Sequence, residues 1–213
     1  MAYNLQDQEQ IDELKAFWAR HGNKILGLLV IAAAVFAGWR AWNWYQADRA
    51  AEAAKAYAGL INVIDAGKEA QIRERYQVIL DDHGDSSYVG MAGLRVADAY
   101  VKAGKAEDAA KVLDGVVRQS QEQGFRQIAG IRLAGLLLDQ KKYDEALKAL
   151  DPGRIGQAQG EMAGNVADRR GDVLTAQGKK GEAKAEYQKA LDQLPASAPL
   201  RPLVQLKLDM VDN

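Results

Sequence analysis

Apolar residues are concentrated in one run near the start of the chain, from Ile25 to Tyr45, which contains a single charged residue, Arg40. As an α-helix this run would be about 31 Å long, and the hydrocarbon core of a bilayer is about 30 Å thick. Arg40 lies near one end, where its long side chain can reach the lipid headgroups. The pattern therefore predicts a single transmembrane helix over residues 25–45.

Aromatic residues gather at the C-terminal end of this run, as is typical where a membrane helix meets the headgroups. The expected contacts with membrane lipid are Trp39, Arg40, Trp42 and Trp44. A cleaved secretory signal ending at Ala32-Ala33-Ala34 is one alternative, although the tail before the run is acidic where a signal would be basic. A buried core helix is the other, and the clustered tryptophans disfavour it.

The first 24 residues are polar, with apolar side chains at helical spacing: Ile11, Leu14, Phe17 and Trp18. This spacing predicts either an amphipathic helix on the membrane surface or a solvated lead-in. Basic residues are equally numerous on the two sides of the apolar run, so the positive-inside rule does not decide its orientation. Arg20 and Lys24 lie closest to their end and favour a cytoplasmic N-terminus.

After residue 45 the chain is rich in Ala, Leu, Glu, Lys and Gln, which predicts an all-α domain over residues 46–213. Several positions recur every 37 residues. Turn residues recur at Gly67, Gly104, Lys141 and Gly178. Residues that open a second helix recur at Ile72, Ala109, Ala146 and Ala183. This period predicts four helix hairpins stacked in an array.

Small residues at a further shared position would let the helices approach closely: Ala56, Gly93, Gly130 and Ala167. The last unit, from Gly171 to Pro195, resembles a tetratricopeptide repeat. Pro152-Gly153 should shorten the second helix of the third unit. An apolar-patterned segment after Pro202 should cap the array. The expected fold is all-α: one N-terminal transmembrane helix, a tetratricopeptide-like helical-hairpin array and a C-terminal capping helix.

Charge and composition argue against several classes of function. Residues 46–213 contain 25 acidic and 24 basic residues, so they lack the basic surface of a nucleic-acid binder. The chain has no Cys and only two His, and it contains no Ser–His–acid or zinc-binding pattern. The acidic stretch around His83 matches no calcium-loop spacing. We expect no enzyme activity, cofactor, metal or small-molecule substrate.

The candidate binding surface consists of first-helix positions that would line the concave groove of such an array. The selected residues are Tyr57, Ile61, Met91, Leu94, Val101, Ile128, Ile131, Leu138, Asp168 and Asp172. This groove would be apolar through three units and acidic in the fourth. The alternative is that some of the apolar residues are core between hairpins.

Three features occur in order along the chain: Phe17-Trp18 in the tail, Gly38-Trp39-Arg40-x-Trp42-Asn43 closing the apolar run, and Val166-Ala167-Asp168-x-Arg170-Gly171-Asp172 in the fourth unit. Together they resemble the ancillary SecYEG translocon subunit family, the YfgM-like inner-membrane proteins. The resemblance implies a cytoplasmic tail over residues 1–24 and a periplasmic domain over residues 46–213. It also implies two partners, the SecYEG translocon and a membrane-anchored periplasmic chaperone of the prolyl-isomerase-like type.

The expected function is that of a membrane-anchored protein-interaction module at the Sec translocon, which helps hand translocated proteins to the periplasmic chaperone network. The alternative is a regulatory or assembly scaffold of the cell envelope that binds a signalling protein or a complex subunit.

Overall fold

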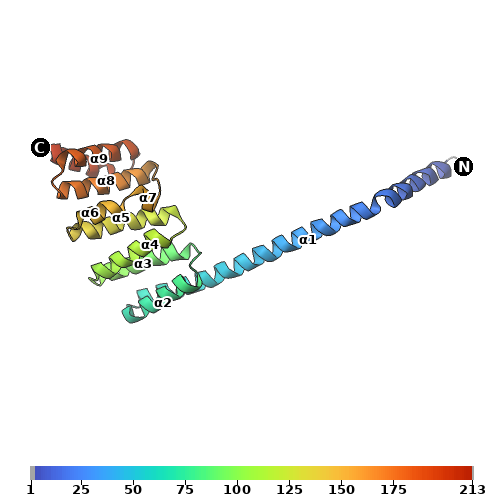
Figure 1. Cartoon of the computed structure of the whole chain (residues 1–213), viewed down its shortest axis with the longest axis horizontal. Helices are drawn as coiled ribbons and strands as arrows, with labels where there is room; N and C mark the ends of the chain where they lie inside the picture. Colours follow the sequence, from blue (N-terminus) through green and yellow to red (C-terminus); the bar gives the residue numbers. More distant parts are fainter. Residues whose placement is uncertain (1–2, 213) are drawn as a thin grey trace. The chain divides into compact units, whose positions relative to one another are not determined.

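The structure is a computed structural model that describes residues 3–212, with side-chain surroundings from residue 9 to residue 211. The helices in this range are α1 Tyr3–Asp65, α2 Glu69–Asp82, α3 Tyr88–Lys102, α4 Ala106–Gln119, α5 Gln123–Asp139, α6 Tyr143–Ala149, α7 Pro152–Ile155, α8 Gly160–Ala176, α9 Lys180–Gln193 and α10 Arg201–Asp212. They form two compact units, Met1–Ala51 and Glu52–Asn213. Within the second unit the helices stack in chain order (Figure 1). The predicted all-α class is confirmed.

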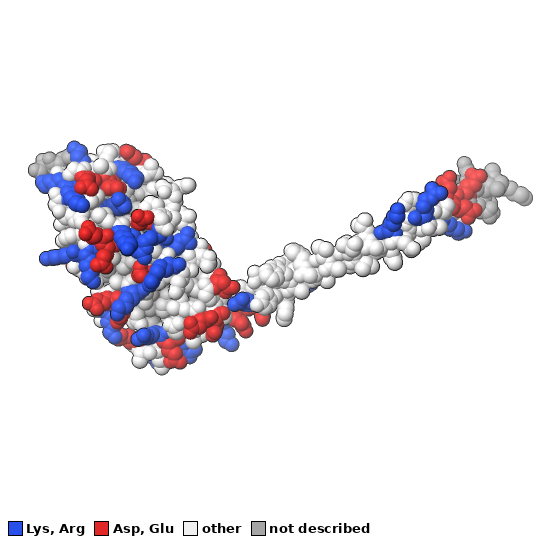
Figure 2. Space-filling view, in the orientation of Figure 1, with Lys and Arg blue, Asp and Glu red and all other residues white. Residues whose placement is uncertain are grey.

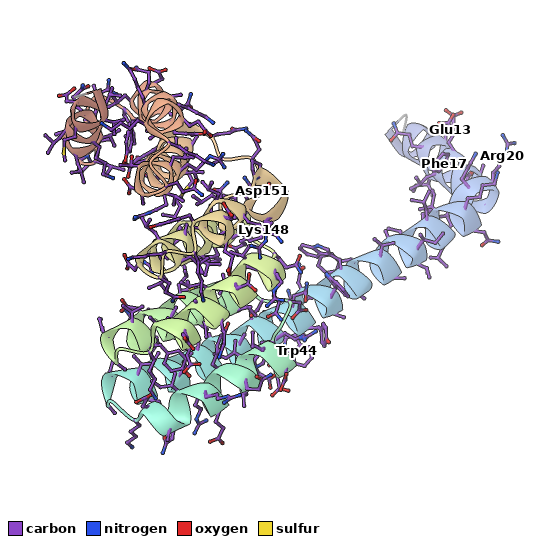
Figure 3. The ribbon with its side chains drawn as sticks, turned by 60° about the vertical axis from the view of Figure 1, so that its left-hand side comes forward. Glu13, Phe17, Arg20, Trp44, Lys148 and Asp151 are labelled. Carbon is purple, nitrogen blue, oxygen red and sulfur yellow. The ribbon has the colours of Figure 1, made fainter. Side chains whose placement is uncertain are left out.

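The first unit contains the predicted apolar segment, whose large side chains are exposed along its length. Leu28 is 72% exposed, and Trp44, also 72% exposed, projects from α1 (Figure 3). Figure 2 shows this part of α1 as a mostly uncharged surface between charged stretches. α1 is long and apolar enough to cross a membrane, and none of its most apolar window is buried. Exposure of so much apolar surface to water is unfavourable, which fits a membrane-spanning segment.

α1 does not end where the apolar segment ends. It continues as one helix to Asp65, so it also supplies the first helix of the first hairpin. The Ala-rich sequence after Tyr45 contains no Gly until Gly59 and no Pro, and alanine has the highest helix propensity. The sequence pattern had separated these two helical regions, and the structure joins them.

Each of the four hairpins has the same turn. The backbone angle φ is positive at all four predicted turn positions: Gly67 (65°), Gly104 (75°), Lys141 (61°) and Gly178 (77°). The following residue donates its N–H to the carbonyl five residues earlier, as Lys105 does to Tyr100 at 2.8 Å. This is the Schellman motif that ends many helices. Glycine adopts positive φ without steric cost, so Lys141 is the strained member of the set.

The core confirms the 37-residue register. The four residues predicted to open second helices are buried, between 0% and 3% exposed: Ile72, Ala109, Ala146 and Ala183. Glycines allow the paired helices to approach closely. A Cβ atom on Gly171 of α8 would lie 2.5 Å from the Tyr187 ring of α9, and one on Gly130 would lie 2.7 Å from Ile155. A larger residue at either position would force the helices apart.

The third hairpin is shortened, as predicted. α6 has 7 residues, whereas α4 and α9 have 14 each. Pro152 begins the short helix α7, and Asp151 caps it (Figure 3). Arg154 of α7 forms an ion pair with Asp114 of α4 at 2.6 Å. The interrupted second helix therefore remains attached to the preceding hairpin.

The C-terminal helix α10 caps the array, as predicted. It packs against α9, and its Val204 and Leu208 are 0% and 7% exposed. These two side chains belong to the same core cluster as Ala183 and Tyr187 of the fourth hairpin. The opposite side of α10 retains exposed apolar residues, of which Met210 is the most exposed at 68%.

Candidate functional site

The ten candidate groove residues all lie on the first helices of their hairpins. Tyr57 and Ile61 are on α1, Met91, Leu94 and Val101 on α3, Ile128, Ile131 and Leu138 on α5, and Asp168 and Asp172 on α8. Their exposure differs. Val101 is 46% exposed, whereas Leu94 (9%) and Asp168 (5%) are buried, and the other seven are partly buried. The burial of Leu94 therefore fits the alternative in which some of the selected apolar residues are core between hairpins.

The pattern of burial shows which side of the first helices is open. One row of equivalent candidates packs into or against the core: Tyr57, Leu94 and Ile131. The next residue in each of the last three units is an arginine, and this row is more exposed: Arg95, Arg132 and Arg169. One residue corresponds to about 100° around a helix. The solvent-exposed side of these helices therefore lies nearer to the arginines than to the row of Tyr57, Leu94 and Ile131.

A hollow of about 330 Å³ opens on this face among α3, α5 and α8. Its lining residues are Ala97, Asp98, Val101, Leu113, Arg132, Gly135, Leu136, Asp139 and Arg169. Val101 is the one sequence-selected residue among them. The other lining residues on the first helices were missed. Four apolar side chains share the hollow with two arginines and two aspartates, so it can accept a segment that is partly apolar and partly charged.

One of the lining residues, Gly135, stands where two other units carry an aspartate. The second and fourth units carry Arg-x₂-Asp, at Arg95–Asp98 and Arg169–Asp172, whereas the third unit carries Arg-x₂-Gly, at Arg132–Gly135. A Cβ atom on Gly135 would have the Arg169 guanidinium carbon as its nearest neighbour, at 3.8 Å, which is an ordinary contact distance. A Cβ atom therefore fits at position 135 in ordinary contact with the Arg169 guanidinium group. The period-37 spacing of these three arginines is the sequence signal that could have located the hollow.

The charged side chains around the hollow differ in whether they have an ion-pair partner. Asp98 pairs with Lys102 at 2.9 Å. Arg169 lies 3.3 Å from Asp172 of its own helix, and its Nε atom is buried without a hydrogen-bond acceptor among the described residues. Arg132 forms no ion pair within the described part of the chain. The arginine side of the hollow therefore carries unpaired positive charge.

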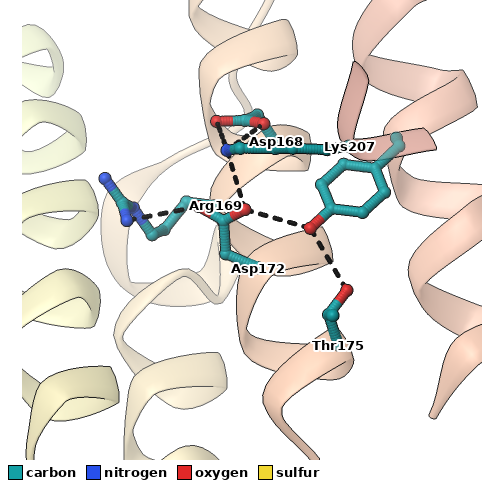
Figure 4. A network of polar contacts seen from close by, with 6 residues as sticks. Asp168, Arg169, Asp172, Thr175 and Lys207 are labelled. Carbon is teal, nitrogen blue, oxygen red and sulfur yellow. Dashed lines mark hydrogen bonds and ion pairs between the residues drawn. The ribbon is translucent and has the colours of Figure 1, made fainter. Parts of the chain in front are cut away.

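The acidic end of the predicted groove is closed by the capping helix (Figure 4). Lys207 of α10 places its Nζ atom 2.8 Å from Asp168 Oδ1 and 2.7 Å from Asp172 Oδ1. Tyr187 donates its hydroxyl hydrogen to Asp172 Oδ1 at 3.0 Å, and Thr175 lies 3.2 Å from the same hydroxyl. These carboxylates hold α10 on the fourth hairpin.

Burial also affects the titration of this network. It raises the pKa of Asp168 above its ordinary value, and the nearby Asp172 adds to the rise, while the hydrogen bond from Lys207 acts in the opposite direction. Burial likewise raises the pKa of the Tyr187 hydroxyl, so it remains a donor to Asp172 at neutral pH. Asp168, buried and bound by Lys207, offers little surface to a partner.

Residues 15–213 match the family model described as a tetratricopeptide repeat-like domain. A protein of Neisseria gonorrhoeae named "Ancillary SecYEG translocon subunit" is 30% identical over 213 residues, which cover 98% of this chain and 99% of the relative. The chain belongs to the ancillary SecYEG translocon subunit family. An Escherichia coli protein of the same name is 27% identical over 206 residues, 95% of each chain. The solved structure "MamA MSR-1 C2" covers 75% of this chain and 84% of its own, at 19% identity and a TM-score of 0.48.

Membership of the ancillary SecYEG translocon subunit family confirms the resemblance found in the sequence, and the alignments extend over the apolar segment as well as the repeats. The expected lipid contacts in that segment are largely exposed: Trp39 is 59%, Trp42 61% and Trp44 72% exposed. Among the described residues, no group of three or more His, Cys, Asp or Glu is placed to hold a metal ion.

Proposed function

We propose that this protein is a single-pass inner-membrane protein with residues 1–24 in the cytoplasm, residues 25–45 in the membrane and residues 46–213 in the periplasm. The exposed apolar length of α1 supports the membrane segment. Arg20 and Lys24, next to the start of this segment, support a cytoplasmic tail. Trp39, Trp42 and Trp44 would lie at the opposite interface.

Its proposed role is that of an interaction module at the SecYEG translocon that helps hand translocated proteins to a membrane-anchored periplasmic chaperone of the prolyl-isomerase-like type. One observation carries this proposal: an array of tetratricopeptide-like hairpins with an open, partly apolar face shares a helix with an unburied apolar segment. Relatives along the whole chain are named as ancillary translocon subunits. Fold alone would not specify this role, because the same array serves many partners.

The open face offers a physical basis for partner binding. The most exposed apolar candidate, Val101, lies beside the hollow, and half-buried Met91 and Ile128 extend the apolar surface along α3 and α5. Removal of apolar surface from water contributes about 25 cal/mol per Å², less the cost of ordering the partner. A helix or extended segment that lies along the first helices would bury these side chains together.

Topology is the first test. A reporter that is active only in the periplasm, fused to the C-terminus of the full chain, should be active, and the same reporter at the N-terminus should be inactive. The isolated protein should retain its tail. A processed N-terminus near Ala34 would contradict the membrane anchor and support a cleaved signal.

Purification of the full chain in mild detergent tests the partners. SecY, SecE and SecG chains and a periplasmic chaperone should copurify. A variant whose residues 25–45 are replaced by an unrelated transmembrane helix should show which partners depend on the anchor and which on the array. Recovery of a signalling protein or another envelope complex without translocon chains would contradict the proposal and support the scaffold alternative.

A further inference from the structure

We propose that the hollow above Gly135 binds the carboxylate of an Asp or Glu side chain from a partner segment that passes along the groove. Arg132 and Arg169 would be its hydrogen-bond donors. The inference rests on the proposed function in one respect, since it names the chemistry of a partner that the groove would bind.

The repeat itself indicates a missing carboxylate. Asp98 and Asp172 occupy equivalent positions on α3 and α8, three residues after an arginine, and Gly135 is their counterpart on α5. Residues three apart on a helix are neighbours on its surface. Arg169 contacts Asp172 at 3.3 Å, whereas Asp98 pairs with Lys102 and Arg95 lies 3.9 Å from Asp65. Arg132 has glycine three residues on and no ion-pair partner among the described residues. Gly135 lines the hollow beside Arg169, so an acid at this position would lie on the wall of the hollow. A partner carboxylate would complete the pattern from outside.

The positive charge available to that carboxylate comes from two helices. Asp172 already forms an ion pair with Lys207 at 2.7 Å and accepts a hydrogen bond from Tyr187 at 3.0 Å, so the 3.3 Å contact with Arg169 is its longest. The Nε atom of Arg169 is buried, so a partner carboxylate would meet the terminal nitrogens of this partly exposed side chain. The planar guanidinium group can donate two parallel hydrogen bonds to a carboxylate.

The other groups in the hollow define what lies next to this carboxylate. Val101 and Leu136 require an apolar neighbour on the partner. Asp98 is already paired with Lys102. Asp139 lies seven residues after Arg132, about 10 Å along α5, so it leaves the arginine end positive and would meet a different part of the segment. The hollow lies among α3, α5 and α8, with another helix beyond each end of this group, so we assign the carboxylate to a side chain within a segment that continues past it.

A binding experiment with the full chain in detergent micelles tests this assignment. The probes are two fluorescein-labelled amphipathic helical peptides with amidated C-termini, identical except for Glu or Gln next to a central Leu. The Glu peptide should bind about tenfold more tightly. A third peptide with Gln and a free C-terminal carboxylate should bind like the Gln peptide. Preference for this third peptide over the Glu peptide would overturn the side-chain assignment.

Variants at Gly135 give the sharpest control. Gly135→Asp supplies the missing carboxylate from α5 itself and should abolish the preference for the Glu peptide. Gly135→Asn has nearly the same shape without the charge and should retain most of the preference. Arg132→Gln should reduce the preference about tenfold, whereas Arg118→Gln on α4, which removes an exposed arginine paired with Asp114, should not change it.

The outcomes separate this inference from the proposed function. Equal binding of the Glu and Gln peptides, absence of binding to any peptide, or equal effects of Gly135→Asp and Gly135→Asn would overturn the carboxylate site, while copurification of translocon chains would still support the proposed function. A clear Glu preference without translocon chains in the purification would retain the site and overturn the proposed function. Circular dichroism of each variant verifies that its helices are intact.

Discussion

The first helices of the third and fourth hairpins, α5 and α8, have the same register but differ in what covers them. On α8, Asp172 follows Arg169 and is bound by Lys207 from the capping helix. On α5, Gly135 follows Arg132, and a hollow remains. At position 172 the chain's own capping helix binds the side chain, whereas the equivalent residue, Gly135, has no side chain to be bound.

This difference shows how a repeat scaffold separates stability from binding. The positions that hold helices together are the same in all units, because each hairpin must bury the same edge against its neighbour. The positions on the open face vary without affecting that packing. In the fourth unit they fasten the cap, which the last repeat requires, and in the third unit they are available to a partner.

The largest effect on stability is expected from removal of the lysine that binds the α8 aspartates. Lys207→Met would leave the buried Asp168 without its cation and Asp172 with Arg169 alone. Loss of one partner from a buried ion pair costs about 3 kcal/mol. The free energy of unfolding, measured by urea denaturation of the full chain in detergent, should fall by about this amount, with loss of helicity from α10. Lys189→Met is the control, because Lys189 is 61% exposed and lies 3.9 Å from Glu186. Equal effects of the two substitutions would contradict the role of Lys207.

Gly171 of α8 and Gly135 of α5 should respond in opposite directions to substitution by alanine. In Gly171→Ala, the added Cβ would lie 2.5 Å from the Tyr187 ring, and overpacking of this kind costs about 1–3 kcal/mol. In Gly135→Ala, the nearest atom is at 3.8 Å, so the higher helix propensity of alanine should stabilise the protein by about 1 kcal/mol. Thermal unfolding midpoints should move down and up, respectively. A decrease for both would show that Gly135 is a packing residue.

A smaller effect is expected from the titration of Asp168. Burial raises its pKa in the folded protein above that of the unfolded chain, so the folded state binds a proton more readily. The stabilisation from this residue is therefore present at low pH and is lost as the pH rises through the folded-state pKa. The thermal midpoint of the wild type relative to Asp168→Asn should be higher near pH 4 than near pH 7. The opposite trend would mean that Lys207 outweighs burial.

Much of the fold could be predicted because the repeat period identifies equivalent residues directly. The turns at Gly67, Gly104, Lys141 and Gly178 and the shortened helix before Pro152 all follow from local backbone chemistry. The continuity of α1 could not be predicted in the same way. After residue 45 its sequence changes from an apolar run to an Ala-rich stretch with charged residues. A change in composition does not require a break in the helix.

The candidate site was harder to predict than the fold. Periodicity shows that Leu94 and Ile131 are equivalent, but the side of the helix that stays open depends on how successive hairpins rotate, which a linear sequence does not encode locally. Leu94 and Ile131 pack into or against the core, and the adjacent Arg95 and Arg132 are more exposed. Partner binding by the selected residues stays a prediction. Lys207 lies 39 residues from Asp168 and outside the four repeats, so no spacing rule pointed to their contact.

The central claim is that the open first-helix face contacts a partner in the cell. A photo-crosslinking amino acid in place of Val101 on this face, in the full chain in cells, tests the claim most directly. Val78 on the second helix α2 is the matched control, because it is also valine and is 40% exposed against 46% for Val101. A discrete crosslinked partner from position 101, absent from position 78, is the result that we predict. Equal crosslinking from both positions, or crosslinking from position 78 alone, would contradict the claim.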